Sequence, residues 1–207
     1  YILFSRAAQW FPLIEKTLKR NKIPDDFKYI ALAESRLTNS ISSQGAVGFW
    51  QFIESTARNY GLEVTNEVDE RYSIEKSTEA ACKFFKEAHQ RFGNWTLTAA
   101  AFNLGIGGIE GHLKKQSSKN YYDLMMNKET SNYVYQILAL KTVFINSGKK
   151  NHGGGTNFYN IPAAILKIDS SITDLSAFAI SKGYNYDILK LHLIYFFFNI
   201  SYSIYII

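Results

Sequence analysis

The sequence predicts a mainly α-helical protein with a small mixed α and β module at its C-terminal end. Apolar residues recur at helical spacing through most of residues 1–147, and the connections between these segments are short. A glycine run at 153–155 precedes a change of pattern. With 207 residues the chain can hold one full core and a small appended module. We therefore expect a helical domain over 1–147, a linker over 148–156 and a module over 157–207.

The first two helices are predicted from their prolines. Pro12 suits a first helical turn and not a helix interior, so a helix is expected over Phe11–Lys19, with the residues before it forming a separate, frayed element. Pro24 and two aspartates open a second helix, which carries Glu34 close to its C-terminal end. The polar segment Thr38–Val47 then predicts a surface loop.

Five further helices follow from apolar spacing and capping residues. Ser73 and Asn94 suit N-caps, and Gly61 and Gly93 suit helix ends. The expected segments are Gly48–Tyr60, Ser73–Phe92, Trp95–Leu104, Ile109–Lys115 and Glu129–Ile145. The glycines at 105, 107 and 108 predict a flexible turn after the helix that ends at Leu104.

The C-terminal module mixes strand and helix patterns. Ala163–Ile168 predicts a strand, Thr173 could cap a helix that ends at Gly183, and Asp187–Leu191 could form another short helix. Every even-numbered position over Ile194–Ile206 is Ile, Phe or Tyr, while Asn199, Ser201 and Ser203 occupy odd positions, and this period of two predicts a second strand. A membrane span over residues 191–207 is the weaker interpretation, because this segment is short against the ~20 residues that a crossing needs and carries polar interruptions.

Composition narrows the classes of partner and cofactor. The net charge is +5, but the basic residues are scattered and no nucleic-acid motif is present, so we expect no nucleic-acid partner. A mildly basic surface of this kind could bind an anionic polymer. The alternative is an ordinary solvated surface. The four histidines lack metal-site spacing with the single cysteine or with acids, so neither a metal nor a cofactor is expected. Cys82 reads as a small core residue. Since the chain begins at Tyr1, any targeting peptide or lipid anchor is expected outside it.

Glu34 is the most informative single residue. It lies on a helix stripe whose other members are Phe27, Ile30, Ala31 and Leu37. A carboxyl held against hydrocarbon keeps its proton to higher pH than a surface carboxyl, and it can then act as a general acid near neutrality. The alternative is an ordinary helix-end glutamate that reaches solvent or an arginine.

Four short motifs occur in a fixed order along the helical domain. They are Glu34-Ser35, Gly48-Phe49-Trp50-Gln51, Ala101-Phe102-Asn103 and Glu129-Thr130-Ser131-Asn132-Tyr133-Val134. Together they resemble the lytic transglycosylases of the goose-lysozyme-like (SLT) superfamily, of the membrane-bound murein transglycosylase D type. The resemblance covers about residues 11–147. It implies a lysozyme-like helical fold with a groove for the glycan strands of peptidoglycan.

The resemblance also implies an activity and a set of site residues. Glu34 would be the sole catalytic acid, cleaving the β-1,4 bond between N-acetylmuramic acid and N-acetylglucosamine without water and leaving 1,6-anhydro-muramoyl ends. Gln51 and Asn103 would lie in the groove, Tyr133 would approach the acid, and Ser35 would help to shape the site. The family implies a periplasmic or cell-envelope monomer that meets the membrane only through an anchor outside this sequence.

Alternatives stay open for several of these residues. Tyr133 could be a core aromatic and Ser35 a helix-end hydroxyl bonded to the preceding turn. Glu54 is expected to be a surface residue and not a second catalytic carboxylate. The C-terminal module resembles a LysM-type glycan-binding module, although His192 stands where asparagine is usual, and a purely structural cap is the alternative. At the level of function, the competing hypotheses are a non-catalytic peptidoglycan-binding protein and a lysozyme-like hydrolase.

Overall fold

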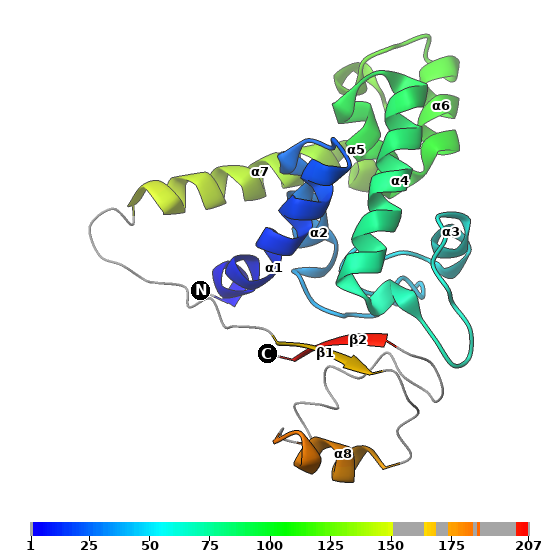
Figure 1. The fold of residues 1–207 in the computed structure, drawn as a ribbon. Coiled ribbons are helices and arrows are strands. Elements are labelled where there is room, and N and C mark those ends of the chain that lie inside the picture. The colour runs from blue at the N-terminus through cyan, green and yellow to red at the C-terminus, as the bar shows by residue number, and fades with distance from the viewer. Residues whose placement is uncertain (1, 151–163, 169–173, 184–185, 187–201, 207) are drawn as a thin grey trace.

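A computed structural model describes residues 2–150, 164–168, 174–183, 186 and 202–206 of the chain. The described part is mainly helical, as predicted, with a single pair of short strands near its C-terminal end (Figure 1). Its longer helices are α1 (Ile2–Arg20), α2 (Lys28–Ser35), α4 (Ile74–Phe92), α5 (Trp95–Leu104), α6 (Ile106–Lys115) and α7 (Lys128–Lys150). The shorter ones are η1 (Asp25–Phe27), α3 (Glu54–Asn59), η2 (Glu70–Tyr72), η3 (Tyr121–Asp123) and α8 (Leu175–Ser181).

Helix α2 lies inside the helical domain, in contact with both α1 and α7. Helix α4 packs against α1 and α5, and α5 in turn packs against α6 and α7 (Figure 1). Each of these helices turns an apolar face to one shared core, whose largest fully buried side chain is Trp50. Phe27, Ile30, Ala31 and Leu37, the predicted stripe around Glu34, are all buried in it. Cys82 is buried as well, and burial raises the pKa of its thiol to about 12.

The capping residues of α4 and α5 confirm the local predictions. The Ser73 hydroxyl accepts a hydrogen bond from the Lys76 amide at the start of α4, and Gly93 ends that helix in a left-handed conformation. The Asn94 side chain then accepts from the Leu97 amide at 3.0 Å. These short-range signals fix both helices at the predicted residues because the capping groups satisfy backbone amides that lack helical partners.

The predicted start of the first helix is wrong. Helix α1 begins at Ile2 and runs through Pro12 without a break. Pro12 is on the exposed side, while Ala7, Phe11 and Ile14 are buried on the other side. Packing of this continuous apolar face stabilises the helix across the proline, although the proline removes a backbone hydrogen bond.

The helix predicted over Gly48–Tyr60 is also wrong over its first half. Only α3 is helical, and the residues before it form tight turns with an isolated bridge between Val47 and Phe52. Gly48 and Gln51 both have positive φ, at 81° and 49°, which no right-handed helix allows. The aromatic spacing of this segment therefore reflects burial in turns and not a helix face.

Two boundaries shift further along the chain. Gly107 and Gly108 lie inside α6, so only Gly105 separates α5 from α6, and the predicted flexible turn is wrong. Helix α7 continues to Lys150, past the predicted end at Ile145 and into the segment predicted as a linker.

The C-terminal part contains the predicted first strand and helix. Strand β1 (Ala164–Ile168) pairs antiparallel with β2 (Tyr202–Ile206), with Ala164 opposite Ile206. Helix α8 is capped by Asp174, which accepts from two backbone amides, and not by Thr173 as predicted. Strand β2 matches the end of the predicted strand over 194–206. The rest of that strand and the helix predicted over 187–191 lie outside the described residues.

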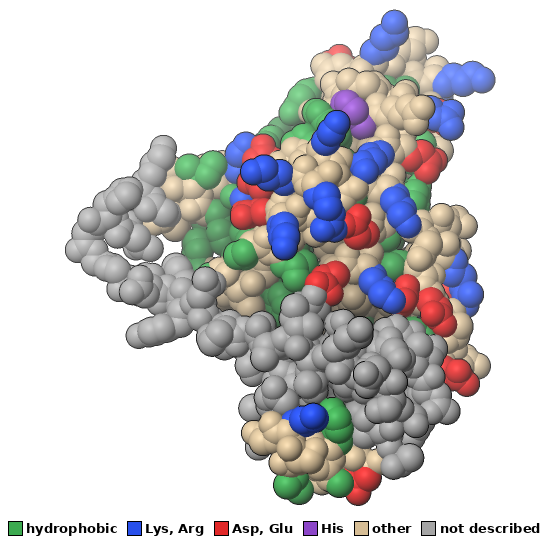
Figure 2. Space-filling model, viewed as in Figure 1, with side chains coloured by type: hydrophobic (Ala, Val, Ile, Leu, Met, Phe, Trp, Pro, Cys, Tyr) green, Lys and Arg blue, Asp and Glu red, His purple; other side chains and the backbone are tan. Residues whose placement is uncertain are grey.

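Two further properties of the described residues are the hydropathy of the helices and the charge of the surface. No helix in the described ranges is both long and apolar enough to cross a membrane. Basic side chains gather over the middle of the molecule, where α1 and α4 lie, with acidic side chains among them (Figure 2). This mixed surface agrees with the modest net charge of +5.

Candidate active site

Glu34 is at the C-terminal end of α2, where the chain turns sharply. The next two residues after Ser35 are Arg36 and Leu37, both in the left-handed conformation, with φ of 55° and 56°. The Arg36 amide still donates to the Leu32 carbonyl oxygen, which closes the helix. Left-handed backbone costs a non-glycine residue about 1–2 kcal/mol, so this turn persists only because surrounding contacts hold it. The turn ends the helix just after Glu34.

The environment of Glu34 favours its protonated form. Burial raises the pKa of its carboxyl to about 7, and the negative charge of Glu129 acts in the same direction. The hydrogen bond from Tyr133 opposes both by stabilising the carboxylate. Burial is the largest of these effects, so near neutral pH the carboxyl can exist in either state. A group poised in this way can both give and take a proton.

Tyr133 reaches Glu34 from α7. Its hydroxyl donates a hydrogen bond to Oε1 of Glu34, across 99 positions of sequence. The ring is buried, with 5% of the residue exposed, and desolvation together with the charge on Glu34 holds the pKa of the phenol well above its ordinary value. Tyr133 is therefore a neutral donor fixed against the acid. The ring belongs to the core, as the alternative interpretation held, and the hydroxyl meets the glutamate.

Glu129 is a neighbour of this pair that the sequence analysis quoted within a motif but to which it gave no role. It lies one helical turn before Tyr133 on α7, and its charge raises the pKa of both Glu34 and Tyr133. The spacing of four residues places both side chains on one face of a helix, so the pattern could have identified it. Among the described carboxylates, Glu129 is the one whose charge raises the pKa of Glu34.

Asn103, at the end of α5, is bound to the same part of α7. Its amide nitrogen donates to Oε1 of Glu129 at 2.9 Å, and its amide oxygen accepts from the Thr130 hydroxyl at 2.8 Å. Thr130 is 1% exposed, and the sequence analysis gave it no role. The asparagine thus fixes the Glu129 carboxylate, while its predicted contact with substrate stays a prediction.

Gln51 lies in the turn that joins Gly48 to α3. Its amide nitrogen donates to the carbonyl oxygens of Gly48 and Ser40, at 2.8 and 2.9 Å. The same nitrogen also lies 3.3 Å from the Ser40 hydroxyl, so all of its partners belong to this loop segment, which sets the side-chain orientation. Within the part of the chain that the structure describes, Gln51 and Glu34 share no hydrogen bond. Whether Gln51 contacts a sugar stays a prediction.

Ser35 connects the end of α2 to this same loop. Its buried hydroxyl lies 2.9 Å from the Phe49 carbonyl oxygen and 3.2 Å from that of Ala31, and it accepts from the Thr38 amide. The contact with Ala31 is the bond to the preceding turn that the alternative interpretation described. The hydroxyl therefore joins the loop to the helix beside Glu34, and a direct contact with substrate stays a prediction.

Three other residues named in the sequence analysis, Phe49, Trp50 and Glu54, lie in the core or on the surface. Trp50 is fully buried and its indole N–H donates to the Thr78 hydroxyl at 2.9 Å, so it belongs to the core. Phe49 packs in the core against Trp10. Glu54 is exposed and paired with Arg58, as expected for a surface residue. Among the described residues no group of three or more histidine, cysteine or acidic side chains is placed to hold a metal ion.

Comparison with known proteins gives two matches to family models. The model of the transglycosylase SLT domain matches residues 11–125. A second model, the C-terminal LysM-like domain of soluble lytic transglycosylases, matches residues 164–192. The first match runs from the second half of α1 to just past η3 and includes Glu34, Gln51 and Asn103.

The chain is also similar to two individual relatives. The chain is 30% identical over 190 residues to membrane-bound lytic murein transglycosylase D of Escherichia coli (strain K12), covering 86% of this chain and 42% of the relative. It therefore spans less than half the length of that curated relative. It is 26% identical over 171 residues to a protein of Alteromonas sp. (strain M-1) named for tributyltin chloride resistance, covering 81% and 82% of the two chains.

A solved structure is also similar. It is that of an inactive mutant of the lytic transglycosylase Slt from Pseudomonas aeruginosa, with a TM-score of 0.48, 18% identity, and coverage of 67% of this chain and 24% of the other. The SLT-domain model, which matches more than half of the chain, decides the assignment. This chain belongs to the transglycosylase SLT domain family.

Proposed function

We propose that this protein is a peptidoglycan lytic transglycosylase in which Glu34 acts first as general acid and then as general base. The proposed substrate is the glycan strand, cut at the β-1,4 bond between N-acetylmuramic acid and N-acetylglucosamine. The single observation that carries the proposal is the partly buried Glu34, with a pKa raised to about 7 and a hydrogen bond from Tyr133, in a chain of this family.

In the first step, protonated Glu34 gives its proton to the glycosidic oxygen as the bond to the muramoyl carbon breaks. Positive charge develops on the sugar ring, and the oxygen of the substrate's own N-acetyl group can stabilise it. Tyr133 donates to the carboxylate that forms, so its hydrogen bond strengthens as charge appears on Glu34. The leaving N-acetylglucosamine end departs with the proton.

In the second step, the Glu34 carboxylate takes the proton of the muramoyl 6-hydroxyl. That oxygen then closes on the positively charged carbon, which forms the 1,6-anhydro ring and returns Glu34 to its protonated state. A pKa of about 7 suits both transfers, because neither state of the carboxyl is strongly favoured near neutral pH. No water is consumed.

In this proposal Glu129 is not a catalytic nucleophile but a charged neighbour that affects the pKa of Glu34. Its carboxylate accepts a hydrogen bond from Asn103, and its charge adds to burial in raising the pKa of Glu34, which favours the protonated acid. A hydrolase with two catalytic carboxyls would instead use the second one to attack the sugar or to activate water.

The mass of the released sugars tests the activity and separates it from the two competing hypotheses. Purified peptidoglycan would be digested with the protein, and the soluble fragments weighed. We expect muramoyl ends that are lighter by one water molecule than reducing ends. Reducing ends would instead identify a hydrolase, and the absence of soluble fragments would identify a binding protein.

The same proposal assigns domains and location. The transglycosylase domain would comprise residues 1–147, and the module over 157–207 would bind glycan strands and raise the local concentration of substrate, as its match to a LysM-like model suggests. The substrate places the protein in the cell envelope or periplasm. Removal of residues 157–207 should weaken retention on insoluble peptidoglycan while preserving cleavage of soluble glycan fragments.

A further inference from the structure

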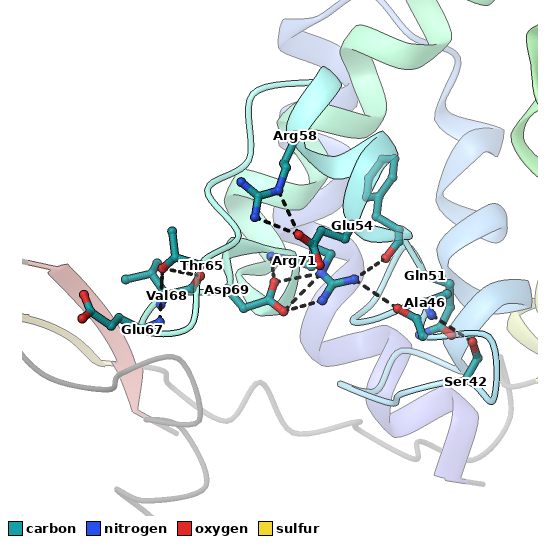
Figure 3. Close-up of polar contacts among 12 residues, drawn as sticks. Ser42, Ala46, Gln51, Glu54, Arg58, Thr65, Glu67, Val68, Asp69 and Arg71 are labelled. Carbon is teal, nitrogen blue, oxygen red and sulfur yellow. Dashed lines mark hydrogen bonds and ion pairs between the residues drawn. The ribbon is translucent and has the colours of Figure 1, made fainter.

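The strongest unassigned feature is a buried arginine behind the loop that carries Gln51. Arg71, in η2, is 7% exposed, and its guanidinium binds groups on two sides (Figure 3). Toward its own element it forms a double contact with the Asp69 carboxylate, through Nε at 2.9 Å and Nη2 at 2.6 Å. Toward the loop, Nη1 donates to the carbonyl oxygens of Gly45 and Phe52, at 3.1 and 3.2 Å.

The two carbonyl groups bound by Arg71 lie on either side of the turn that contains Gln51. The Phe52 carbonyl oxygen also accepts from the Val47 amide at 3.1 Å, so Arg71 reinforces the bridge that closes the turn. The arginine therefore spans the base of the turn from 45 to 52, while Gln51 lies within it. A single side chain holds both ends of this segment.

The backbone of Arg71 fixes the same turn from a second direction. A Cβ atom on Gly48 would lie 2.1 Å from the Arg71 carbonyl oxygen, so the two backbones are in direct contact there. Only glycine fits this approach, and Gly48 also has a φ of 81°. The loop is thus packed against η2 at Gly48 and hydrogen-bonded to it at Gly45 and Phe52.

Gln51 needs such support because its own backbone is strained. Its φ of 49° is unfavourable for a residue with a side chain, and its amide nitrogen is bound to backbone oxygens of the loop. If the contacts at Phe52 were lost, Gln51 could relax to an ordinary conformation, and its side chain would then leave its present position.

We infer that Arg71, oriented by Asp69, is a positioning residue that presets the loop of Gln51 for glycan binding. The inference rests on the proposed function, since it assigns Gln51 to the substrate. Lysine cannot replace the arginine, because one ammonium group cannot bind a carboxylate doubly and reach two carbonyl oxygens at the same time. Arg71 itself touches no substrate in this account.

The experiment compares Arg71→Lys with Arg58→Lys. Arg58 chelates Glu54 on the exposed side of α3 but contacts no loop carbonyl oxygen, so it is a matched control. Each substitution would be made in two proteins. In the Glu34→Gln protein it would be tested for binding of a soluble glycan fragment, and in the protein with native Glu34 it would be tested for its effect on kcat and KM. We expect Arg71→Lys to weaken binding and to raise KM about tenfold, with a smaller change in kcat, while Arg58→Lys changes neither.

A double-mutant cycle with Gln51→Ala separates positioning from general stability. If Arg71 acts through Gln51, the effect of Arg71→Lys on glycan binding should largely vanish once Gln51 is alanine. Equal losses in the two backgrounds would overturn the inference. Asp69→Asn, which keeps the arginine but weakens its orientation, should show the same coupling at smaller size.

Separate measurements report on the folding of each variant and on the activity of the wild-type protein. Circular dichroism and thermal unfolding would be recorded for each variant, and loss of folding in both Arg71→Lys and Asp69→Asn would overturn the inference, because the contact would then serve the whole fold. Wild-type protein that releases no anhydro sugars would refute the proposed activity. The binding cycle would still report on Arg71, since it uses the Glu34→Gln protein.

Discussion

The Tyr133 hydroxyl donates a hydrogen bond to the Glu34 carboxyl and so joins α7 to the end of α2. This bond stabilises the charged carboxylate, whereas burial and the charge of Glu129 stabilise the protonated acid. The pKa of Glu34 is therefore the outcome of opposed effects from three identifiable sources. Each source can be changed separately, and two of the changes should move the pH dependence of the reaction in opposite directions.

Tyr133→Phe removes the hydrogen bond and keeps the buried ring. The pKa of Glu34 should rise above about 7, because the carboxylate loses its donor. Since Glu34 must begin protonated, the alkaline limb of the activity profile should move to higher pH, and activity at its plateau should fall about tenfold because the acid is less well oriented. The measurement is kcat against pH. An unchanged limb would show that the phenol does not act on Glu34.

Glu129→Gln removes a charge and keeps a carbonyl oxygen that can accept from Asn103. The pKa of Glu34 should fall below about 7, because the nearby negative charge no longer disfavours the carboxylate. The alkaline limb should then move to lower pH, opposite to its movement in Tyr133→Phe. The same pH series on both variants measures this, with Glu54→Gln as the control for loss of an exposed carboxylate. A shift in the same direction for both variants would contradict the account.

The pH dependence of stability gives an independent test of the raised pKa. Glu34 titrates near 7 in the folded protein and near 4.5 in the unfolded chain, so between these values the folded state binds more protons. Stability should therefore fall as pH rises from about 4.5 to 7, by roughly 2 kcal/mol for a partly buried group. Glu34→Gln should abolish that fall and unfold at a higher temperature than wild type at pH 8. Parallel unfolding curves for the two proteins across pH 4–8 would contradict this prediction.

Gly48→Ala tests the contact between the loop and η2. The added Cβ would meet the Arg71 carbonyl oxygen at 2.1 Å, and the φ of 81° is unfavourable for alanine, so the free energy of unfolding should fall by at least about 2 kcal/mol. Gly111→Ala in α6 is the matched control, because nothing lies within 4 Å of its added Cβ. That substitution should stabilise the protein by about 0.5–1 kcal/mol. Chemical unfolding measures both, and equal effects would refute the role of the contact.

Local signals explain which helices could be predicted from the sequence. Ser73, Gly93 and Asn94 fix α4 and α5 through contacts with near neighbours, so these helices were predicted at the correct residues. Pro12 misled the prediction of α1, because the buried face that carries the helix past the proline depends on packing with other helices.

The candidate site was predictable only in part. The apolar stripe identified Glu34, and the family resemblance carried by the four motifs implied that Tyr133 would approach it. The turn at Gly48–Gln51 was mistaken for a helix because its positive φ values are held by Arg71, which lies 20 residues beyond Gln51. The spacing of Glu129 and Tyr133 in the quoted motif places both on one helix face, but the influence of Glu129 on Glu34 could not be predicted because it depends on how α7 packs against α2.

The most direct test of the central claim is the analysis of products released by wild-type protein and by Glu34→Gln. The substitution removes the only proton-transferring group in the proposed reaction while keeping a similar shape, so the variant should fold and bind glycan yet lose turnover by at least about 1,000-fold. Wild-type protein should release 1,6-anhydro-muramoyl ends. Near wild-type release of these ends by Glu34→Gln would contradict the account.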